Sequence, residues 1–147
     1  MSAVADVTAR TVLTVNFCYG NEFTDDTMNE IITAMDKEYI KGFSLLGGEP
    51  FEKENRVAVQ YILKTIKEHF PNKTVWCYSG FTFEELVGEC EDILKYIDVL
   101  VDGAFVAEKK NLKLKFRGSE NQRIINVKKS LEDKTVTELT EGEYDEY

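Results

Sequence analysis

The sequence predicts an α/β domain built around parallel strands. Helix-period segments alternate with short apolar runs along the middle of the chain, which is typical of strand, helix, strand units. The segments between these runs are long enough for helical crossovers, and such crossovers join parallel strands. A chain of 147 residues with 43% hydrophobic residues suits one domain with a sizeable core. We therefore expect a single domain over residues 1–131 and an acidic tail over 132–147.

The first predicted helix begins after Thr24, because Thr24-Asp25-Asp26 is a typical start signal. Apolar side chains follow with a helical period, at Met28, Ile31, Ile32 and Met35. The run "GFSLL" comes next, and its short apolar character indicates a buried strand that two glycines end. Nearer the amino terminus, "TVLTV" is a candidate strand for the exposed edge of the sheet.

A second helix is predicted beyond Pro50, with "FPNK" at its end. Its expected apolar face consists of Ala58, Tyr61, Ile62, Thr65, Ile66 and His69. His69 lies near the helix end, where we expect it to cap backbone carbonyls. The run "TVWCY" follows directly and is the second buried strand.

A third helix is predicted after Thr82, which forms a capping box with Glu85. The apolar positions that mark it are Phe83, Leu86, Val87, Cys90 and Leu94. "DVLVDG" is then the third buried strand. Further on, "LKLKF" alternates apolar and polar residues, which predicts an edge strand or one arm of a hairpin.

The charge of the chain argues against nucleic acid as a partner. Its net charge of −9 would repel a phosphate backbone, and no stripe of basic and aromatic residues offsets it.

Residues 132–147 hold seven acids and one lysine, a net charge of −6, and are expected to form a mobile, solvated tail. The chain shows no apolar stretch near the ~20 residues of a membrane span and no secretory signal, so we expect it in the cytoplasm.

The cysteines and the single histidine limit the kinds of metal site, disulfide and catalytic triad that the chain can form. Cys18, Cys77 and Cys90 are widely spaced and odd in number, which argues against a disulfide framework and fits a reducing compartment. Neither a CxxC pair nor a second histidine is present, so zinc sites and histidine-based triads lack their usual residues. Cys77 lies in a predicted strand and Cys90 on an apolar helix face, where cysteine usually acts as a small buried hydrophobe.

Three strand ends carry glycine, and they define the candidate site. "GGEP" (47–50) follows the first buried strand, "YSG" the second and "VDG" the third, so all three fall on the rim where open α/β folds bind ligands. Glu49 can accept a hydrogen bond from an ammonium group, while Pro50 can stiffen the loop and start the next helix. The plain alternative is that glycine commonly ends strands. Neither G-x-x-x-x-G-K-[ST] nor G-x-G-x-x-G occurs, so no phosphate loop is predicted.

Four segments, in this order, carry a family resemblance: "FSLLGGEPF", "VWCYSGFTFEEL", "IDVLVDGAFV" and "KFRGSENQRIINV". They resemble the activating proteins of anaerobic ribonucleoside-triphosphate reductase, which belong to the radical S-adenosylmethionine enzymes. The resemblance covers about 16–127, and "FRGSENQRIINV" is more specific than the Gly-Gly-Glu element.

The resemblance implies a partial parallel β/α barrel with a [4Fe-4S] cluster and S-adenosylmethionine. In that family a 5′-deoxyadenosyl radical takes hydrogen from a glycine of the partner, the anaerobic ribonucleoside-triphosphate reductase. By the resemblance, Gly47, Gly48 and Glu49 would meet the amino group of the methionine moiety. Ser79 and Gly80 are candidates for its ribose or carboxylate. Asp102 is either a site residue or a turn residue, and Arg117 meets a substrate carboxylate, the partner or solvent.

The sequence departs from the family at its amino terminus. The family carries C-x-x-x-C-x-x-C, because three thiolates must hold the cluster, and no such triplet occurs here. We therefore predict a shortened or altered first strand and no metal ligands in this chain. The glycyl-radical-activating enzyme remains one interpretation. The alternatives are a non-catalytic member that keeps the fold and S-adenosylmethionine or reductase binding, and an unrelated nucleotide-binding α/β module.

Overall fold

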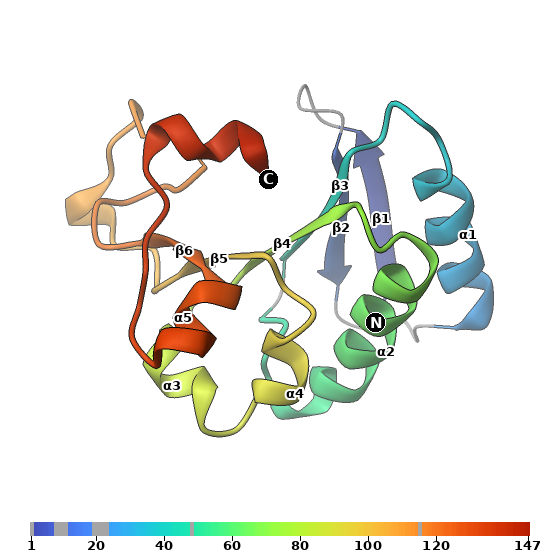
Figure 1. Cartoon of the computed structure of the whole chain (residues 1–147), viewed down its shortest axis with the longest axis horizontal. Coiled ribbons are helices and arrows are strands. Elements are labelled where there is room, and N and C mark those ends of the chain that lie inside the picture. Colours follow the sequence, from blue (N-terminus) through green and yellow to red (C-terminus); the bar gives the residue numbers. More distant parts are fainter. Residues whose placement is uncertain (1, 8–11, 19–23, 48, 115) are drawn as a thin grey trace.

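The computed structural model describes residues 2–7, 12–18, 24–47, 49–114 and 116–147. They form one six-stranded sheet with helices packed on it (Figure 1). The strands are β1 (Ser2–Val7), β2 (Val12–Cys18), β3 (Gly42–Gly47), β4 (Thr74–Tyr78), β5 (Val99–Asp102) and β6 (Arg123–Asn126). The α-helices are α1 (Asp25–Met35), α2 (Arg56–His69), α3 (Phe83–Val87), α4 (Glu91–Leu94) and α5 (Val127–Asp133). Short 3₁₀ segments are η1 (Lys53–Asn55), η2 (Ala107–Lys109) and η3 (Glu141–Glu146).

The sheet has a parallel centre and antiparallel edges. Strands β2 to β5 pair in parallel, whereas β1 and β6 pair antiparallel with their neighbours. Spatial order follows chain order from β1 to β6, which is the arrangement found in β/α barrels and differs from that of doubly wound sheets. The structure confirms the α/β prediction and shows that "GFSLL", "TVWCY" and "DVLV" are adjacent parallel strands.

The two faces of the sheet are buried by different parts of the chain. The helices cover one face, and their core includes Phe43, Leu45, Val75, Cys77, Leu100 and Ile125 from the strands. The opposite face is covered by the carboxyl-terminal segment, residues 137–147, which lies across β4 to β6 (Figure 1). Its core contains Trp76, Val99, Val101, Ile124, Leu139 and Tyr144. Alternation along β4 to β6 therefore supplies two separate cores.

The carboxyl-terminal segment is packed where a solvated tail was expected. Leu139 is 6% exposed and Tyr144 is 8% exposed. The Leu139 amide donates to the Ile124 carbonyl at 2.8 Å, so the segment is also hydrogen-bonded to β6. Its mobility stays a prediction, but its apolar side chains belong to the second core.

Two expectations for the helices need correction. The buried face of α2 is Val59, Ile62, Leu63 and Ile66, whereas Tyr61 and His69 are exposed. The spacing i, i+3, i+4, i+7 thus starts one residue later than expected. The third helix is broken into α3 and α4 around Gly88, although the capping box of Thr82 and Glu85 is confirmed.

Pro50 starts a turn, and α2 begins only after η1. This differs from the helix start expected at the proline. His69 Nδ1 lies 2.9 Å from the Thr65 carbonyl oxygen, one turn back inside α2, so the histidine contacts a helix carbonyl but not one of the last four that a cap would satisfy.

The prediction of a strand at "LKLKF" (112–116) is wrong for the described residues of this segment, from which residue 115 is left out. Asn111 instead organises a turn, in which its side chain accepts from the Lys113 amide and its carbonyl accepts from the Leu114 amide. Leu112 is 88% exposed, so the apolar alternation there buries nothing. The edge is formed by β6, which the sequence reasoning missed. "TVLTV" does contribute to a strand, β2, but β1 covers its outer edge.

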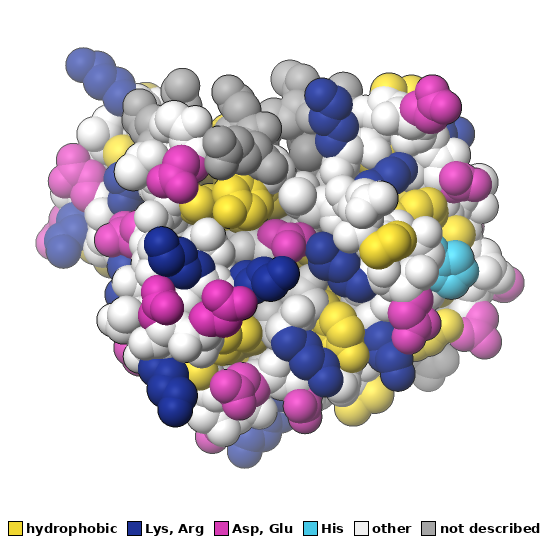
Figure 2. All heavy atoms as spheres, viewed as in Figure 1, with side chains coloured by type: hydrophobic (Ala, Val, Ile, Leu, Met, Phe, Trp, Pro, Cys, Tyr) yellow, Lys and Arg dark blue, Asp and Glu magenta, His cyan; other side chains and the backbone are white. Residues whose placement is uncertain are grey.

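Charges of both signs are interspersed on the face of the molecule shown in Figure 2. Within the described residues, none of the helices has the length and apolar character that a membrane span requires.

Gly42 is expected to be sensitive to substitution because β3 and β4 approach each other closely there. A Cβ atom at Gly42 would lie 2.6 Å from Thr74 Oγ1 and 2.9 Å from the Thr74 carbonyl oxygen, so the backbone would have to move. We expect Gly42→Ala to lower the free energy of unfolding by about 1–3 kcal/mol. Urea denaturation measures this, with Gly88→Ala as control, since nothing lies within 4 Å of a Cβ there. Equal losses in both variants would contradict the prediction.

Candidate functional site

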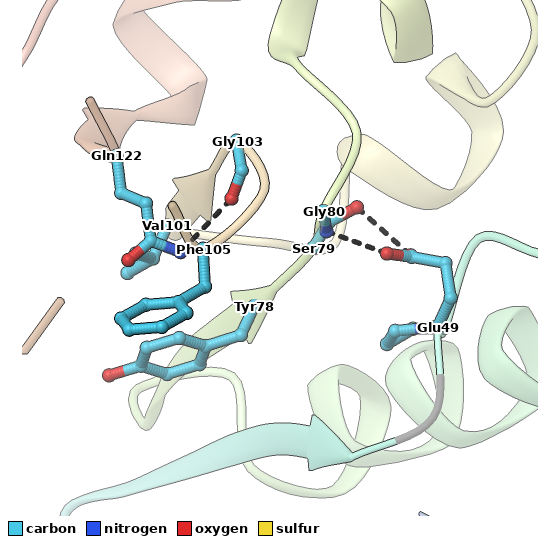
Figure 3. Close-up of a pocket in the computed structure, with 9 residues that line it drawn as sticks. Glu49, Tyr78, Ser79, Gly80, Val101, Gly103, Phe105 and Gln122 are labelled. Atoms are coloured by element: carbon cyan, nitrogen blue, oxygen red, sulfur yellow. Dashed lines mark hydrogen bonds between the residues drawn. The ribbon is translucent and has the colours of Figure 1, made fainter. Parts of the chain in front are cut away.

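A cavity of about 250 Å³ opens at the carboxyl ends of the parallel strands (Figure 3). Glu49 and Pro50 follow β3, Ser79 and Gly80 follow β4, and Gly103 follows β5. All five line this cavity. The parallel arrangement thus brings three separate strand ends to one rim, as the sequence predicts.

The carboxylate of Glu49 joins the first two strand ends. Its Oε1 accepts from the Gly80 amide at 2.6 Å, and its Oε2 accepts from the Ser79 hydroxyl at 2.9 Å (Figure 3). The Phe51 amide also donates to Oε2, at 2.9 Å. An ionised carboxylate can accept about four hydrogen bonds, so these three leave Glu49 with acceptor capacity for a further donor.

The proton of the Ser79 hydroxyl has a defined direction. The Phe81 amide lies 3.0 Å from Ser79 Oγ and can only donate, so the hydroxyl oxygen accepts there. The Ser79 proton is therefore available for Glu49. Ser79 is 6% exposed, which makes this a nearly buried, fully directed hydrogen-bond chain.

The glycines of the rim differ in what the structure shows. Gly47 is the last residue of β3, while Gly48 lies outside the described residues. Gly103 has φ of 94°, a conformation that side chains rarely adopt, so glycine is required at this turn. A Cβ at Gly80 would meet only Glu49 Oε1, at 3.4 Å. The Glu49 carboxylate is thus the only group among the described residues that packs close to Gly80 on this side.

The other wall of the cavity consists of residues that sequence reasoning missed: Tyr78, Val101, Phe105 and Gln122. Tyr78 and Phe105 both line the cavity, and in Figure 3 their rings point away from Glu49. Period-two alternation in "TVWCY" could have identified Tyr78, because it places that residue on the face opposite Cys77. The positions of Phe105 and Gln122 depend on how their loops pack, so no pattern in the sequence could have placed them at the cavity.

The "FRGSENQR" segment builds this second wall through its own side chains. Gln122 Oε1 accepts from the amides of Gly118 and Ser119, at 2.9 and 3.1 Å. Gln122 Nε2 donates to the Gly103 carbonyl at 3.0 Å (Figure 3). Arg117 donates to the carbonyls of Glu120 and Gln122, so it stabilises the loop itself.

Asp102 lies in β5 and is 1% exposed, so it is neither a cavity-lining residue nor an exposed turn residue. It pairs with Arg123, which also pairs with Glu84. The Asp102 and Glu84 carboxylates raise the pKa of Arg123 above its ordinary value. Conversely, hydrogen bonds from Arg123 lower the pKa of Glu84.

The described cysteines do not fit a [4Fe-4S] cluster. Cys77 is fully buried in β4 and Cys90 is 1% exposed between α3 and α4. Burial, and to a lesser degree the Glu49 carboxylate, raises the pKa of the Cys77 thiol, and burial also raises that of Cys90. Cluster ligands are thiolates, so these environments oppose ligation. Within the described residues, no three His, Cys, Asp or Glu side chains gather in a way that could hold a metal ion.

Comparison with known proteins identifies the family. A family model described as "4Fe-4S single cluster domain" matches residues 10–125. The anaerobic ribonucleoside-triphosphate reductase-activating protein of Enterobacteria phage T4 is 37% identical over 107 residues, which cover 71% of this chain and 65% of the phage protein. The protein of the same name from Vibrio cholerae is 38% identical, over 71% of this chain and 69% of its own length.

The relative from Escherichia coli K12, which also has that name, is 34% identical over 70% of this chain and 68% of its own length. The matched segments thus span about two thirds of these curated relatives. No solved structure shows significant similarity to the chain. The chain therefore belongs to the family of anaerobic ribonucleoside-triphosphate reductase-activating proteins.

Proposed function

We propose that this chain acts as an activating protein for anaerobic ribonucleoside-triphosphate reductase and that its strand-end rim binds S-adenosylmethionine. The activity is supported by the shared name of the relatives at 34–38% identity. The sequential order of the parallel strands supports a partial β/α barrel of the radical S-adenosylmethionine type. The reductase would be the partner, in the cytoplasm.

Glu49 is the observation that carries the ligand assignment. Its half-buried carboxylate lines the cavity and keeps acceptor capacity beyond its three hydrogen bonds. A methionine ammonium group supplies the matching charged donor, and hydrogen bonds to charged groups are the stronger ones. Gly47 and Gly48 would allow the ligand to approach the backbone closely.

The remaining rim residues would orient the ligand. Ser79 and Gly80 hold the Glu49 carboxylate in place and lie next to the ligand's ribose or carboxylate. A cavity of about 250 Å³ is just below the ~300–1,000 Å³ of typical small-molecule sites, so it suits one end of the ligand. Bound there, S-adenosylmethionine would be cleaved by one electron from an iron–sulfur donor into methionine and a 5′-deoxyadenosyl radical, and that radical would take hydrogen from a glycine of the reductase.

The described residues support no electron-transfer step, because their cysteines do not fit the cluster. The burial of Cys77 and Cys90 favours a second candidate function, that of a non-catalytic family member that binds S-adenosylmethionine or the reductase. Formation of a glycyl radical on added anaerobic reductase, observed by electron paramagnetic resonance, would distinguish the activating enzyme from the non-catalytic member.

Titration calorimetry with S-adenosylmethionine tests the rim. We expect weak binding by the native chain and at least a roughly tenfold loss in Glu49→Gln, because the charged acceptor for the ammonium is removed. Glu52→Gln is the matched control, since this exposed acid in the same loop directs no side-chain hydrogen bond into the cavity. Gly48→Val should abolish binding by filling the space of the approaching ligand. If the native chain does not bind S-adenosylmethionine, the strand-end residues form turns and no ligand site. If all variants bind equally, the site lies elsewhere.

A further inference from the structure

Asp102 is a buried carboxylate at the end of β5, and both of its oxygens accept hydrogen bonds. Its Oδ1 accepts from Arg123 Nε at 3.0 Å, and its Oδ2 accepts from Arg123 Nη2 at 2.6 Å. The Phe83 amide also donates to Oδ2, at 2.7 Å. A buried carboxylate needs such pairing, because an unpaired charge at 1% exposure would be strongly destabilising.

The bond to Phe83 ties the end of β5 to the loop that follows β4. Phe83 is the first residue of α3, so Asp102 accepts one of the backbone amides that the start of this helix leaves without an intrahelical partner. Two residues earlier, the Phe81 carbonyl accepts from the Gly103 amide at 3.1 Å. The loop of residues 79–83 is thus attached to β5 on both sides of Thr82.

The other end of this loop faces the candidate ligand site. Ser79 Oγ accepts from the Phe81 amide and donates to Glu49, and the Gly80 amide donates to the same carboxylate. Each contact in the series from Arg123 to Glu49 is a hydrogen bond of 3.1 Å or shorter. The ends of β5, β4 and β3 are therefore connected in one network.

We infer that Asp102, clamped by the Arg123 guanidinium, is a positioning residue that holds the 79–83 loop so that Ser79 and Gly80 orient Glu49 for its ligand. Asp102 does not line the cavity, so it acts only through the loop. The inference rests on the proposed function for the identity of the ligand, but the positioning itself can be measured on the free protein.

Hydrogen exchange of single backbone amides measures the positioning. In Asp102→Asn, the negative charge is lost and one of the two acceptor oxygens becomes an NH₂ donor that faces an N–H group of Arg123, so the hold of Arg123 on residue 102 should weaken and the loop should loosen. We expect the Gly80 amide to exchange roughly tenfold faster or more, as a hydrogen bond to a charged acceptor is weakened. The Leu45 amide, in the centre of the sheet, should keep its protection and serves as the internal control for folding.

Glu84→Gln is the matched variant, because Glu84 is the second carboxylate bound to Arg123. Its side chain is 59% exposed, whereas that of Asp102 is 1% exposed. Exposed ion pairs contribute little, so Gly80 exchange should stay as in the native chain. A merely structural role for the whole network would instead loosen Gly80 to the same extent in both variants.

Arg123→Lys covers the case in which Asp102→Asn fails to fold. It keeps a cation beside Asp102 but loses the planar fork that binds Asp102 at both oxygens. Gly80 should then exchange several-fold faster while Leu45 stays protected. Unchanged Gly80 exchange in a folded Asp102→Asn or Arg123→Lys protein would overturn the inference.

Calorimetry with S-adenosylmethionine on the same variants separates the two proposals. A loss of affinity that parallels the loosening of Gly80 supports both. Loosening of Gly80 without binding by the native chain contradicts the proposed ligand and leaves the positioning role supported.

Discussion

A chain ending after Val136 is expected to expose Trp76 and to lose about 3 kcal/mol or more of unfolding free energy. Removing 137–147 takes Leu139 and Tyr144 from the second core, and a buried large apolar side chain contributes ~1.5–3 kcal/mol. The ring of Phe116 packs edge-on against both Trp76 and Tyr144, with centroids 5.2 and 5.4 Å apart, so the aromatic cluster also loses one end.

Trp76 reports this change directly, because it is the single tryptophan of the chain and is 1% exposed. In the shortened chain, the Trp76 emission should shift to the red and its indole ring should become accessible to quenching by acrylamide. The midpoint of urea unfolding should also be lower. The control replaces the exposed acids Glu132 and Glu138 with Gln in the full chain, which reduces the negative charge of the tail and keeps its packing. If the shortened chain matched the native one in emission and midpoint, the segment would be the detached, solvated tail that its composition indicates.

The strands were predictable where both faces of the sheet are buried. "TVWCY" and "DVLV" are continuous apolar runs because the helices cover one side and the carboxyl-terminal segment covers the other. The same pattern gives no information about which part of the chain provides each cover. The acidic composition of residues 132–147 indicates a solvated tail. Leu139 and Tyr144 are nevertheless buried, and they hold the segment on the sheet.

The errors have local causes. Strand β6 has only two apolar residues between Arg123 and Asn126, so it lacks the apolar run that identified β5, and it is stabilised by pairing with β5. "LKLKF" has the alternation of a strand, but the Asn111 turn leaves Leu112 in solvent. Gly88 and the residues after it interrupt a helical pattern that otherwise continues to Leu94.

Half of the candidate site followed from topology alone. Residues directly after parallel strands must share a rim, so Glu49, Ser79 and Gly80 could be grouped before their hydrogen bonds were known. Phe105 and Gln122 could not be, because their positions depend on side-chain contacts within a long loop. The buried role of Asp102 was hidden for the same reason, since its partner Arg123 lies 21 residues further along the chain.

Anaerobic reconstitution of this 147-residue chain with iron and sulfide is expected to give less than one [4Fe-4S] cluster per chain. Three thiolates are required, and two of the three cysteines, Cys77 and Cys90, are inside the core. Cys77 faces the helix-covered core from the middle of the sheet, so bringing it to a cluster would require opening β4. Cys18 ends β2, and one cysteine cannot supply the set.

Iron and sulfide analysis, combined with alkylation and mass spectrometry, measures both parts of this argument. Cys77 and Cys90 should resist iodoacetamide in the native chain and react after denaturation, because burial keeps both thiols protonated. Cys77→Ala serves as control and should leave the low iron content unchanged. A stable brown protein with about four irons per chain, whose colour is lost in Cys18→Ala, would contradict the prediction. That outcome would mean that Cys18 ligates a cluster together with groups other than the two buried thiols, and it would restore the activating enzyme as the function of this chain on its own.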